Sequence, residues 1–264
     1  MLADLKEIIE NSDMVLIGLG EEFNDILALK KDTDYEQGRQ WIEAEGLFWL
    51  LPAYEQECRR KLPKRQEEMK EALNNLADIL KDKNYFVVST SVNDLIREIP
   101  WKTGRLVMPC GGSIKKQCSE ACEGALQELT ENDNKIIELY IKNNVCTKKF
   151  EKNAPMLGKC PKCNKPYVLN NIYAEHYDES GYIPQWQLYT KWLQGTLNKK
   201  VLILELGVGM KFPSVIRWPF EKVAFFNQKA SFYRVNESLY QMSEELKDKG
   251  TSISKNAVDW LRDI

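Results

Sequence analysis

The sequence has no excess of basic residues, since 37 Lys and Arg stand against 39 Asp and Glu among its 264 residues. Without such an excess there is little to attract phosphates, so the composition predicts no nucleic-acid partner and no membrane partner. Its longest apolar runs, such as 201–208, are far shorter than the ~20 residues that span a bilayer. The first residues lack the basic stretch and the cleavage site of a signal peptide. These absences predict a cytoplasmic protein.

Short apolar segments alternate with longer helical ones along the chain. The apolar segments are typical of strands buried on both faces of a parallel sheet, and they cover residues 14–18, 85–90, 105–108, 201–206 and 231–235. Helices are expected over 2–11, 65–80 and 255–262, the last with Ser254 as its N-cap. The alternation predicts an α/β fold with a Rossmann-like, doubly wound parallel sheet.

Two stretches interrupt this alternation. Residues 24–64 are polar, helical and aromatic, and residues 111–199 contain the cysteine pairs without a βα rhythm. We interpret both as insertions that form a smaller zinc-ribbon and helical lobe within one domain spanning 1–264. The large lobe is expected to comprise approximately residues 1–23, 65–110 and 200–264, and the small lobe approximately 24–64 and 111–199.

Four of the seven cysteines form two closely spaced pairs. Three residues separate Cys118 from Cys122, and two separate Cys160 from Cys163. In a reducing compartment this spacing indicates a metal rather than disulfides. Four thiolates suit tetrahedral zinc and leave no open position for chemistry, so a structural zinc module is expected over 118–163. The alternative is a set of buried cysteines without metal.

A strand that ends in Gly18-Leu19-Gly20 is a Rossmann-type opening, which is a weak signal by itself. It becomes specific through the motifs that follow it, which are Ser89 to Asn93, Pro109 to Gly112, the two cysteine pairs, Glu205 to Pro213, and Asn236. This order resembles that of the sirtuins. Segments 117–122, 205–213 and 218–220 resemble the macrodomain-linked (class M) branch in particular, and the resemblance covers nearly the whole chain.

The resemblance implies a large Rossmann-like lobe, a small zinc lobe and an NAD cleft between them. Most sirtuins remove acyl groups from lysine with NAD. The class M branch instead resembles protein ADP-ribosyltransferases, whose acceptor is a lipoyl-carrier protein related to the glycine cleavage H protein. A macrodomain protein or such a carrier is therefore the expected partner. The resemblance assigns cofactor contacts to Gly18, Gly20, Gly207, Val208 and Asn236.

The first glycine turn departs from the sirtuin pattern. Sirtuins carry G-A-G-x-S or G-A-G-x-G there, whereas Glu21 and Glu22 follow Gly20 in this chain. The turn is expected to open a helix whose N-terminal N–H groups would hold a diphosphate. A carboxylate there satisfies the helix dipole, which is worth about 0.3–1 kcal/mol, and repels the negative charges of NAD. One interpretation is that an acid caps its own helix. The other is that both acids weaken NAD binding.

The catalytic positions that the resemblance identifies are also altered. Sirtuins carry Thr-x-Asn-Ile/Val-Asp near the nicotinamide ribose, and this chain has Ser91 and Asn93 at the Asn and Asp positions. The carboxylate that would support the ribosyl cation is therefore absent. Counting back from Cys118 places Cys110 where deacylating sirtuins carry His and the class M branch carries Gln. A thiol could act as a nucleophile, but the absence of an activating neighbour favours a small residue at a strand end.

Three other residues have reactive side chains. Cys58 and Cys146 lie in stretches of helical character and are expected to be ordinary helix residues. His176 is the single histidine of the chain and could serve as a base. Its neighbours Glu175 and Asp178 favour a solvent-facing residue in an acidic loop.

Three functions remain open at this stage. The first is a degenerate sirtuin without turnover and with weak NAD binding, which acts as a binding or regulatory subunit. The second is an active NAD-dependent ADP-ribosyltransferase that uses other residues. The third is a pocket that has been repurposed for another nucleotide or a metabolite. Three altered catalytic elements favour the first, whereas the intact zinc module and adenosine side favour the second.

Overall fold

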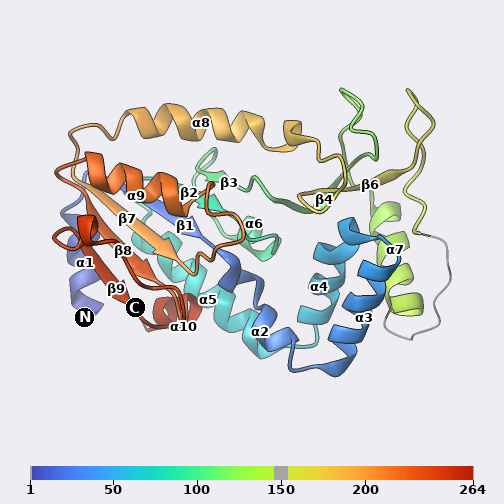
Figure 1. Cartoon of the computed structure of the whole chain (residues 1–264), viewed down its shortest axis with the longest axis horizontal. Coiled ribbons are helices and arrows are strands. Elements are labelled where there is room, and N and C mark those ends of the chain that lie inside the picture. Colours follow the sequence, from blue (N-terminus) through green and yellow to red (C-terminus); the bar gives the residue numbers. More distant parts are fainter. Residues whose placement is uncertain (1, 146–153, 264) are drawn as a thin grey trace.

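The computed structural model describes residues 2–145 and 154–263 and contains a six-stranded sheet in its large lobe (Figure 1). All pairs in this sheet are parallel, and the strand order is β3-β2-β1-β7-β8-β9. The strands are β1 (Met14–Leu19), β2 (Asn84–Ser89), β3 (Leu106–Val107), β7 (Val201–Leu206), β8 (Ser231–Val235) and β9 (Gly250–Ile253). The five expected strands are confirmed within one or two residues, and β9 is an additional edge strand.

Helices cover both faces of this sheet, which confirms the doubly wound arrangement. One face packs against α1 (Leu2–Glu10), α5 (Pro63–Ile79), α6 (Leu95–Glu98) and α10 (Ala257–Arg262). The other packs against α8 (Ile183–Gln194) and α9 (Arg217–Phe226), which lie together above the sheet in Figure 1. Alternation along β1 divides its side chains between these cores, since Val15 and Ile17 join the first and Leu16 the second.

The small lobe has an apolar core of its own. Its helices are α2 (Ile26–Leu29), α3 (Thr33–Ala44), α4 (Leu51–Arg59) and α7 (Glu131–Tyr140), and its antiparallel sheet has the order β5 (Gln127–Glu128), β4 (Gly111–Cys118), β6 (Tyr167–Asn171). Short helical turns lie at η1 (Glu21–Asn24), η2 (Phe48–Leu50), η3 (Ile141–Val145), η4 (Glu179–Gly181) and η5 (Glu244–Leu246). Helices α3, α4 and α7 and strands β4 and β6 lie together on the right of Figure 1.

Helix α8 lies within the stretch 111–199, yet it packs against the large sheet. The rings of Tyr189 and Trp192 lie 5.3 and 5.8 Å from that of Phe86 in β2. Trp192 also donates a hydrogen bond of 2.7 Å from Nε1 to Oδ1 of Asn84. The chain thus returns to the large lobe before β7 begins.

The expected N-cap of the last helix is wrong. Helix α10 begins at Ala257, and its N-cap is Asn256, whose Oδ1 accepts hydrogen bonds from the backbone N–H groups of Val258 and Asp259. Ser254 instead directs its hydroxyl to the carbonyl of Glu237. Strand β9 ends at Ile253, and the chain turns tightly at Ser254, where the N–H of Lys255 donates to the carbonyl of Ile253, so the helix begins only after this turn.

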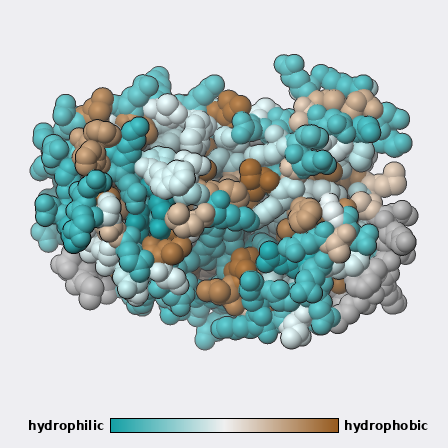
Figure 2. Space-filling model, viewed as in Figure 1, coloured by the Kyte–Doolittle hydropathy of each residue, from teal (hydrophilic) through white to brown (hydrophobic). Residues whose placement is uncertain are grey.

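The surface is mainly hydrophilic on the face shown in Figure 2, where hydrophobic residues form small, separate patches. Within 2–145 and 154–263, none of the helices has the length and apolar character needed to cross a bilayer.

Candidate functional site

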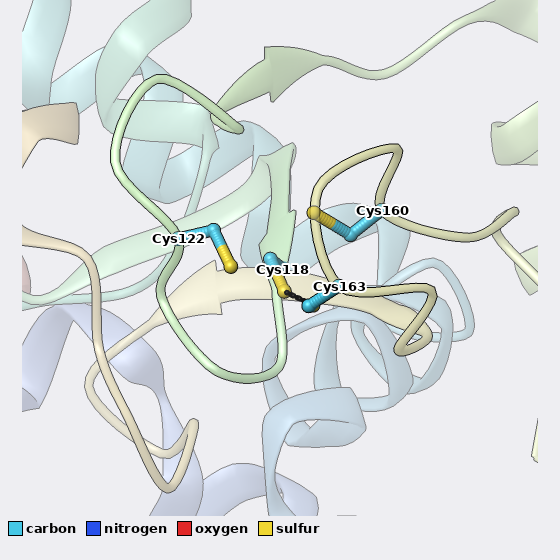
Figure 3. Close-up of side chains that lie close together, drawn as sticks. All are labelled: Cys118, Cys122, Cys160 and Cys163. Atoms are coloured by element: carbon cyan, nitrogen blue, oxygen red, sulfur yellow. Dashed lines mark hydrogen bonds between the residues drawn. The ribbon is translucent and has the colours of Figure 1, made fainter.

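The four paired cysteines converge in the small lobe (Figure 3). Cys118 ends β4, Cys122 lies in the loop after it, and Cys160 and Cys163 lie in the turn before β6. Their Sγ atoms all lie within 4.8 Å of one another, and those of Cys118 and Cys163 are 3.3 Å apart. A tetrahedral zinc ion with Zn–S bonds of ~2.3 Å requires sulfur atoms about 3.8 Å apart. The cluster therefore fits a structural zinc ion.

The four thiols differ in their pKa. Burial would raise the pKa of Cys160, but backbone N–H groups of Lys162 and Cys163 outweigh it and lower the pKa to about 7. Hydrogen bonds with the sulfur atoms of Cys163 and Cys118 raise the pKa of Cys122 to about 12, so binding of zinc as four thiolates would release protons from the cluster. Cys58 lies outside the cluster and is buried in α4, as expected of an ordinary helix residue. Cys146 lies outside the described residues.

The glycines at the carboxyl edge of the large sheet mediate close packing. A side chain at Gly18 would place its Cβ 2.5 Å from Ile216 and 2.9 Å from Phe220, so this glycine lets α9 approach the sheet. A Cβ at Gly20 would lie 2.2 Å from the Cα of Val208. The first turn and the turn after β7 therefore touch backbone to backbone, and Gly207 completes that second turn with a φ of 62°.

Glu21 and Glu22 accept hydrogen bonds from backbone N–H groups of distant segments. Oε2 of Glu21 lies 2.6 Å from the nitrogen of Gly209, in the turn after β7. Oε1 of Glu22 accepts from Glu237 at 2.8 Å, and its Oε2 accepts from Ala257 at 2.7 Å. Three backbone donors at this edge are thus satisfied by carboxylates of the chain itself.

Neither acid caps its own helix, which overturns one interpretation of the sequence. Gly20 is the N-cap of η1, and no side chain bonds to the N-terminus of this single turn. Glu22 instead bonds to the first residue of α10, where a carboxylate is favoured by the helix dipole. Burial raises the pKa of Glu22 above its ordinary value, against the opposing effect of its two backbone bonds.

A buried network of charged side chains lies next to this edge of the sheet. Glu205 of β7 is fully buried, and its carboxylate receives Nε of Arg234 at 2.7 Å and Nη2 of Arg217 at 3.1 Å. Nη2 of Arg217 also donates to the carbonyl of Val208 at 2.8 Å. Asn236 adds a bond of 3.1 Å from its Nδ2 to the same carbonyl. The carbonyl of Val208 therefore accepts hydrogen bonds from two side chains, those of Arg217 and Asn236.

The side chains of Ser91 and Asn93 are fully buried and bonded within the protein. The hydroxyl of Ser91 donates to Oδ1 of Asn24 at 2.8 Å and accepts from the N–H of Asn93 at 3.1 Å. Nδ2 of Asn93 donates to the carbonyl of Phe23 at 2.9 Å, and its Oδ1 accepts from Leu95 at 3.1 Å. Both residues thus fasten the loop after β2 to η1.

Cys110 lies between the lobes with a buried thiol. Burial, together with the charge of Glu21, raises its pKa to about 12. A neutral thiol is a poor nucleophile, since the thiolate is the reactive form. The geometry therefore favours the small-residue interpretation. His176 is exposed, and its carbonyl accepts a hydrogen bond from the side chain of Gln117.

A contact between the lobes lies near Cys110. Lys211, in the segment after β7, donates from Nζ to the hydroxyl of Tyr173 at 2.7 Å and lies 4.3 Å from the centre of its ring. Burial lowers the pKa of Lys211, and the negative charge of Glu55 opposes this shift. Tyr173 follows β6, so this pair joins the large lobe to the small one.

Several residues at this edge were missed in the sequence. Arg234 carries a usable signal, because it is the one charged residue of its strand and pairs in register with Glu205. Asp25 has a φ of 56° and lies directly after η1, where no motif marks it. Asn24 and Glu237 gain their roles only through contacts with distant segments.

The fold can be placed among known structures. No family model matches the chain. Sir2Tm bound to a propionylated peptide aligns with a TM-score of 0.55 at 12% identity, covering 99% of this chain and 96% of that chain. A Sir2 homologue in a complex with ADP ribose aligns with a TM-score of 0.56 at 10% identity, covering 100% and 94%. The chain therefore has the sirtuin fold.

One relative is similar in sequence. A protein ADP-ribosyltransferase of Staphylococcus aureus (strain Mu50) is 25% identical over 157 residues, which are 59% of this chain and 48% of that protein. The match thus spans about half the length of that relative. The sirtuin resemblance of the sequence is confirmed at the level of the fold and of its cysteine cluster.

Proposed function

We propose that this sirtuin-like protein does not turn over NAD and acts as a binding or regulatory subunit. Its zinc module and lobe arrangement would present a sirtuin-shaped surface to a partner. By family resemblance that partner is a macrodomain protein or a lipoyl-carrier protein. NAD itself would bind weakly or not at all.

The observation that carries this proposal is the bonding of Glu21 and Glu22. A bound diphosphate would need backbone N–H groups at the strand ends, and those of Gly209, Glu237 and Ala257 already donate to these two carboxylates. Two like charges about 4 Å apart repel by about 4 kcal/mol at an effective permittivity of 20. A diphosphate would therefore lose its donors and meet a repulsive charge at the same place.

The state of the catalytic positions supports the same proposal. Ser91 and Asn93 are buried and hydrogen-bonded to Asn24 and Phe23, so neither offers a free group to a ribose. The raised pKa of Cys110 keeps its thiol protonated near neutral pH. A general base typically contributes 10²- to 10⁴-fold to the rate, and no replacement stands at these three positions.

A second function is favoured by the sequence match. The relative from Staphylococcus aureus is named a protein ADP-ribosyltransferase, so the alternative is an active NAD-dependent transferase that modifies a lipoyl-carrier protein. This activity would need residues other than Ser91, Asn93 and Cys110.

The deciding experiment titrates the purified protein with NAD and ADP-ribose while thermal unfolding is followed. A ligand at 100 times its Kd would stabilise the folded state by about 2.7 kcal/mol. We expect little or no stabilisation by either ligand at millimolar concentration. Nicotinamide release is then measured with an acyl-lysine peptide and with a lipoylated carrier protein, and neither should support turnover. Micromolar NAD binding or steady nicotinamide release would overturn the proposal in favour of the transferase.

A further inference from the structure

An apolar groove with a volume of about 440 Å³ lies between the last turns of α8 and α9. Each helix ends shortly before a strand of the large sheet begins, so the groove lies at the amino edge of that sheet. One face of each helix forms a wall, with residues at the i, i+3, i+4 and i+7 spacing of a single helix face. These residues are Thr190, Leu193, Gln194 and Leu197 on the α8 side, and Pro219, Lys222, Val223 and Phe226 on the α9 side.

Large apolar side chains at this groove are exposed to solvent. Leu197 is 74% exposed and Phe226 is 69% exposed. Phe225 is also exposed, and its ring centre lies 5.1 Å from that of Phe226. Figure 2 shows hydrophobic residues at the upper left of the molecule, over the ends of α8 and α9 in Figure 1. Neighbouring apolar side chains that remain exposed and have a polar rim are typical of binding surfaces.

The rim of the groove carries positive charge. Lys222 is the single charged residue among the described residues that line it. On the α8 side, Lys191 and Lys199 directly follow the lining residues Thr190 and Asn198. All three lysines are exposed, and none of them belongs to an ion pair within 2–145 and 154–263. Their charges are therefore available to an anionic partner.

Negative charge of the protein itself is compensated in this region. Stretch 183–230 contains two acids, Glu205 and Glu221, and both are paired with Arg234. The end of α9 would carry the negative end of a helix dipole, but Nζ of Lys249 donates to three carbonyls there, at 3.2 to 3.3 Å. The acids of a partner would therefore meet lysines without repulsion from these two helices.

We propose that this groove binds an amphipathic helix of a partner protein, whose apolar stripe is bordered by acidic residues. The stripe packs between Leu197 and Phe226, while the acids face Lys222 on one side and Lys191 and Lys199 on the other. A helix in a groove buries its apolar face through residues one turn apart. The inference goes beyond the proposed function, because the groove lies at the sheet edge opposite to Glu21 and is open whether or not NAD binds.

The shape and the charge of the surface argue against two other occupants. A second copy of this chain, docked symmetrically, would bring the lysines of one groove against those of the other, and like charges oppose such a contact. A lipid surface is flat, whereas the apolar side chains here form the walls of a groove.

The test selects binders of the whole protein from a display library of amphipathic helices. The apolar stripe of the library is fixed, and the positions that border it vary. We expect Glu and Asp to be enriched at these positions, and calorimetry with a selected peptide should show binding that weakens as salt is raised. Basic borders among the selected helices, or no binder at all, would overturn the inference.

Matched variants locate the binding. Phe226→Ser should weaken the selected peptide at least about tenfold through loss of an aromatic anchor, and Lys222→Glu should weaken it about tenfold through reversal of a charge. Both residues are exposed, and thermal unfolding checks that each variant is folded. The controls Leu139→Ser and Lys135→Glu change exposed residues of α7, far along the chain from the groove, and should leave the affinity unchanged. Equal effects of the two sets would contradict the assignment.

The other occupants have their own outcomes. A dimer of the free protein that Phe226→Ser dissociates, measured by sedimentation, would assign the groove to a second copy. Binding to vesicles of phosphatidylglycerol and phosphatidylcholine that Phe226→Ser abolishes would assign it to a membrane. Either result would overturn the inference and leave the proposed function in place, whereas micromolar NAD binding would refute the proposed function alone.

Discussion

Two regions of the molecule differ in whether their polar groups are available to a ligand. They are the cysteine cluster of the small lobe and the carboxyl edge of the large sheet. Four sulfur atoms converge within 4.8 Å in the small lobe, at a spacing that fits a tetrahedral zinc ion. At the edge of the large sheet, the backbone donors of Gly209, Glu237 and Ala257 are already bonded to two glutamates. The sulfur atoms of the cysteine cluster are available to a metal ion, whereas the backbone donors at the sheet edge are already hydrogen-bonded to side chains of the protein.

This difference teaches that the two regions are held together in different ways. The two glutamates bind together the first turn, the turn after β7 and the start of α10. In the proposed function, their carboxylates take the place that an anion would occupy. The zinc cluster has no such substitute, because no neighbouring side chain can replace the bonds from four thiolates to a cation.

Zinc removal should have the largest effect. We expect one zinc per chain in freshly purified protein, and Cys160→Ser should lose it together with the order of the small lobe. Structural zinc contributes on the order of 10 kcal/mol of apparent binding free energy. Metal analysis and thermal unfolding would check this.

Cys110→Ser is the matched control, since this buried cysteine lies outside the cluster. It should retain zinc. Purified wild-type protein that contains four free thiols and no metal would contradict the prediction of a zinc site.

The second-largest effect on stability should come from disruption of the buried ion network of Glu205, Arg217 and Arg234. Glu205→Gln leaves the buried Arg217 without its anion, and leaves Arg234 with Glu221 alone. Removal of one partner from a buried pair costs about 3–5 kcal/mol, whereas zinc content should not change. Denaturant unfolding would measure the loss. Glu244→Gln removes an exposed pair with Lys247 and should change stability by less than about 1 kcal/mol. An equal effect in both variants would refute this role of the network.

Removal of the two glutamate charges should restore some anion binding. In the double variant Glu21→Ala with Glu22→Ser, three backbone donors are released and the repulsion of about 4 kcal/mol is lost. We expect NAD affinity to rise at least about tenfold, or 1.4 kcal/mol, without turnover, because Ser91 and Asn93 remain. Calorimetry compares this variant with Glu7→Gln, which changes an exposed acid of α1. No gain in affinity would show that other groups close the site.

The pH dependence of stability should change least. Because the pKa of Glu22 is raised in the folded state, the folded protein holds this proton more tightly than the unfolded chain. Its contribution to stability therefore falls as pH rises from about 4.5 through the raised pKa. Glu22→Gln should lose this slope. Thermal unfolding between pH 4.5 and 7.5 checks it, and an unchanged slope would contradict it.

The strands of the large sheet could be predicted because five of them are short and strongly apolar. Strand β9 was not predicted, because its sequence Gly-Thr-Ser-Ile is polar and lies half exposed at the sheet edge. The N-cap Asn256 was not predicted, because Ser254 is an equally good capping residue by type. Only the end of β9 decides between them.

The zinc ligands could be predicted because their spacing is local to each pair. The partners of Glu21 and Glu22 could not, because they lie 188, 215 and 235 residues away along the chain. The sequence shows that two acids follow the glycine turn, but only the fold determines whether they face solvent, their own helix or a distant N–H.

The contact of Lys211 with Tyr173 has a mechanical consequence. It crosses from one lobe to the other, so any relative rotation that moves the lobes apart here must pull the ammonium group off the aromatic ring. At an exposed position the cation–π contact is worth about 0.5–1 kcal/mol, and the hydrogen bond to the hydroxyl adds about 1 kcal/mol. This pair therefore resists such a rotation far less than the buried packing within each lobe resists unfolding.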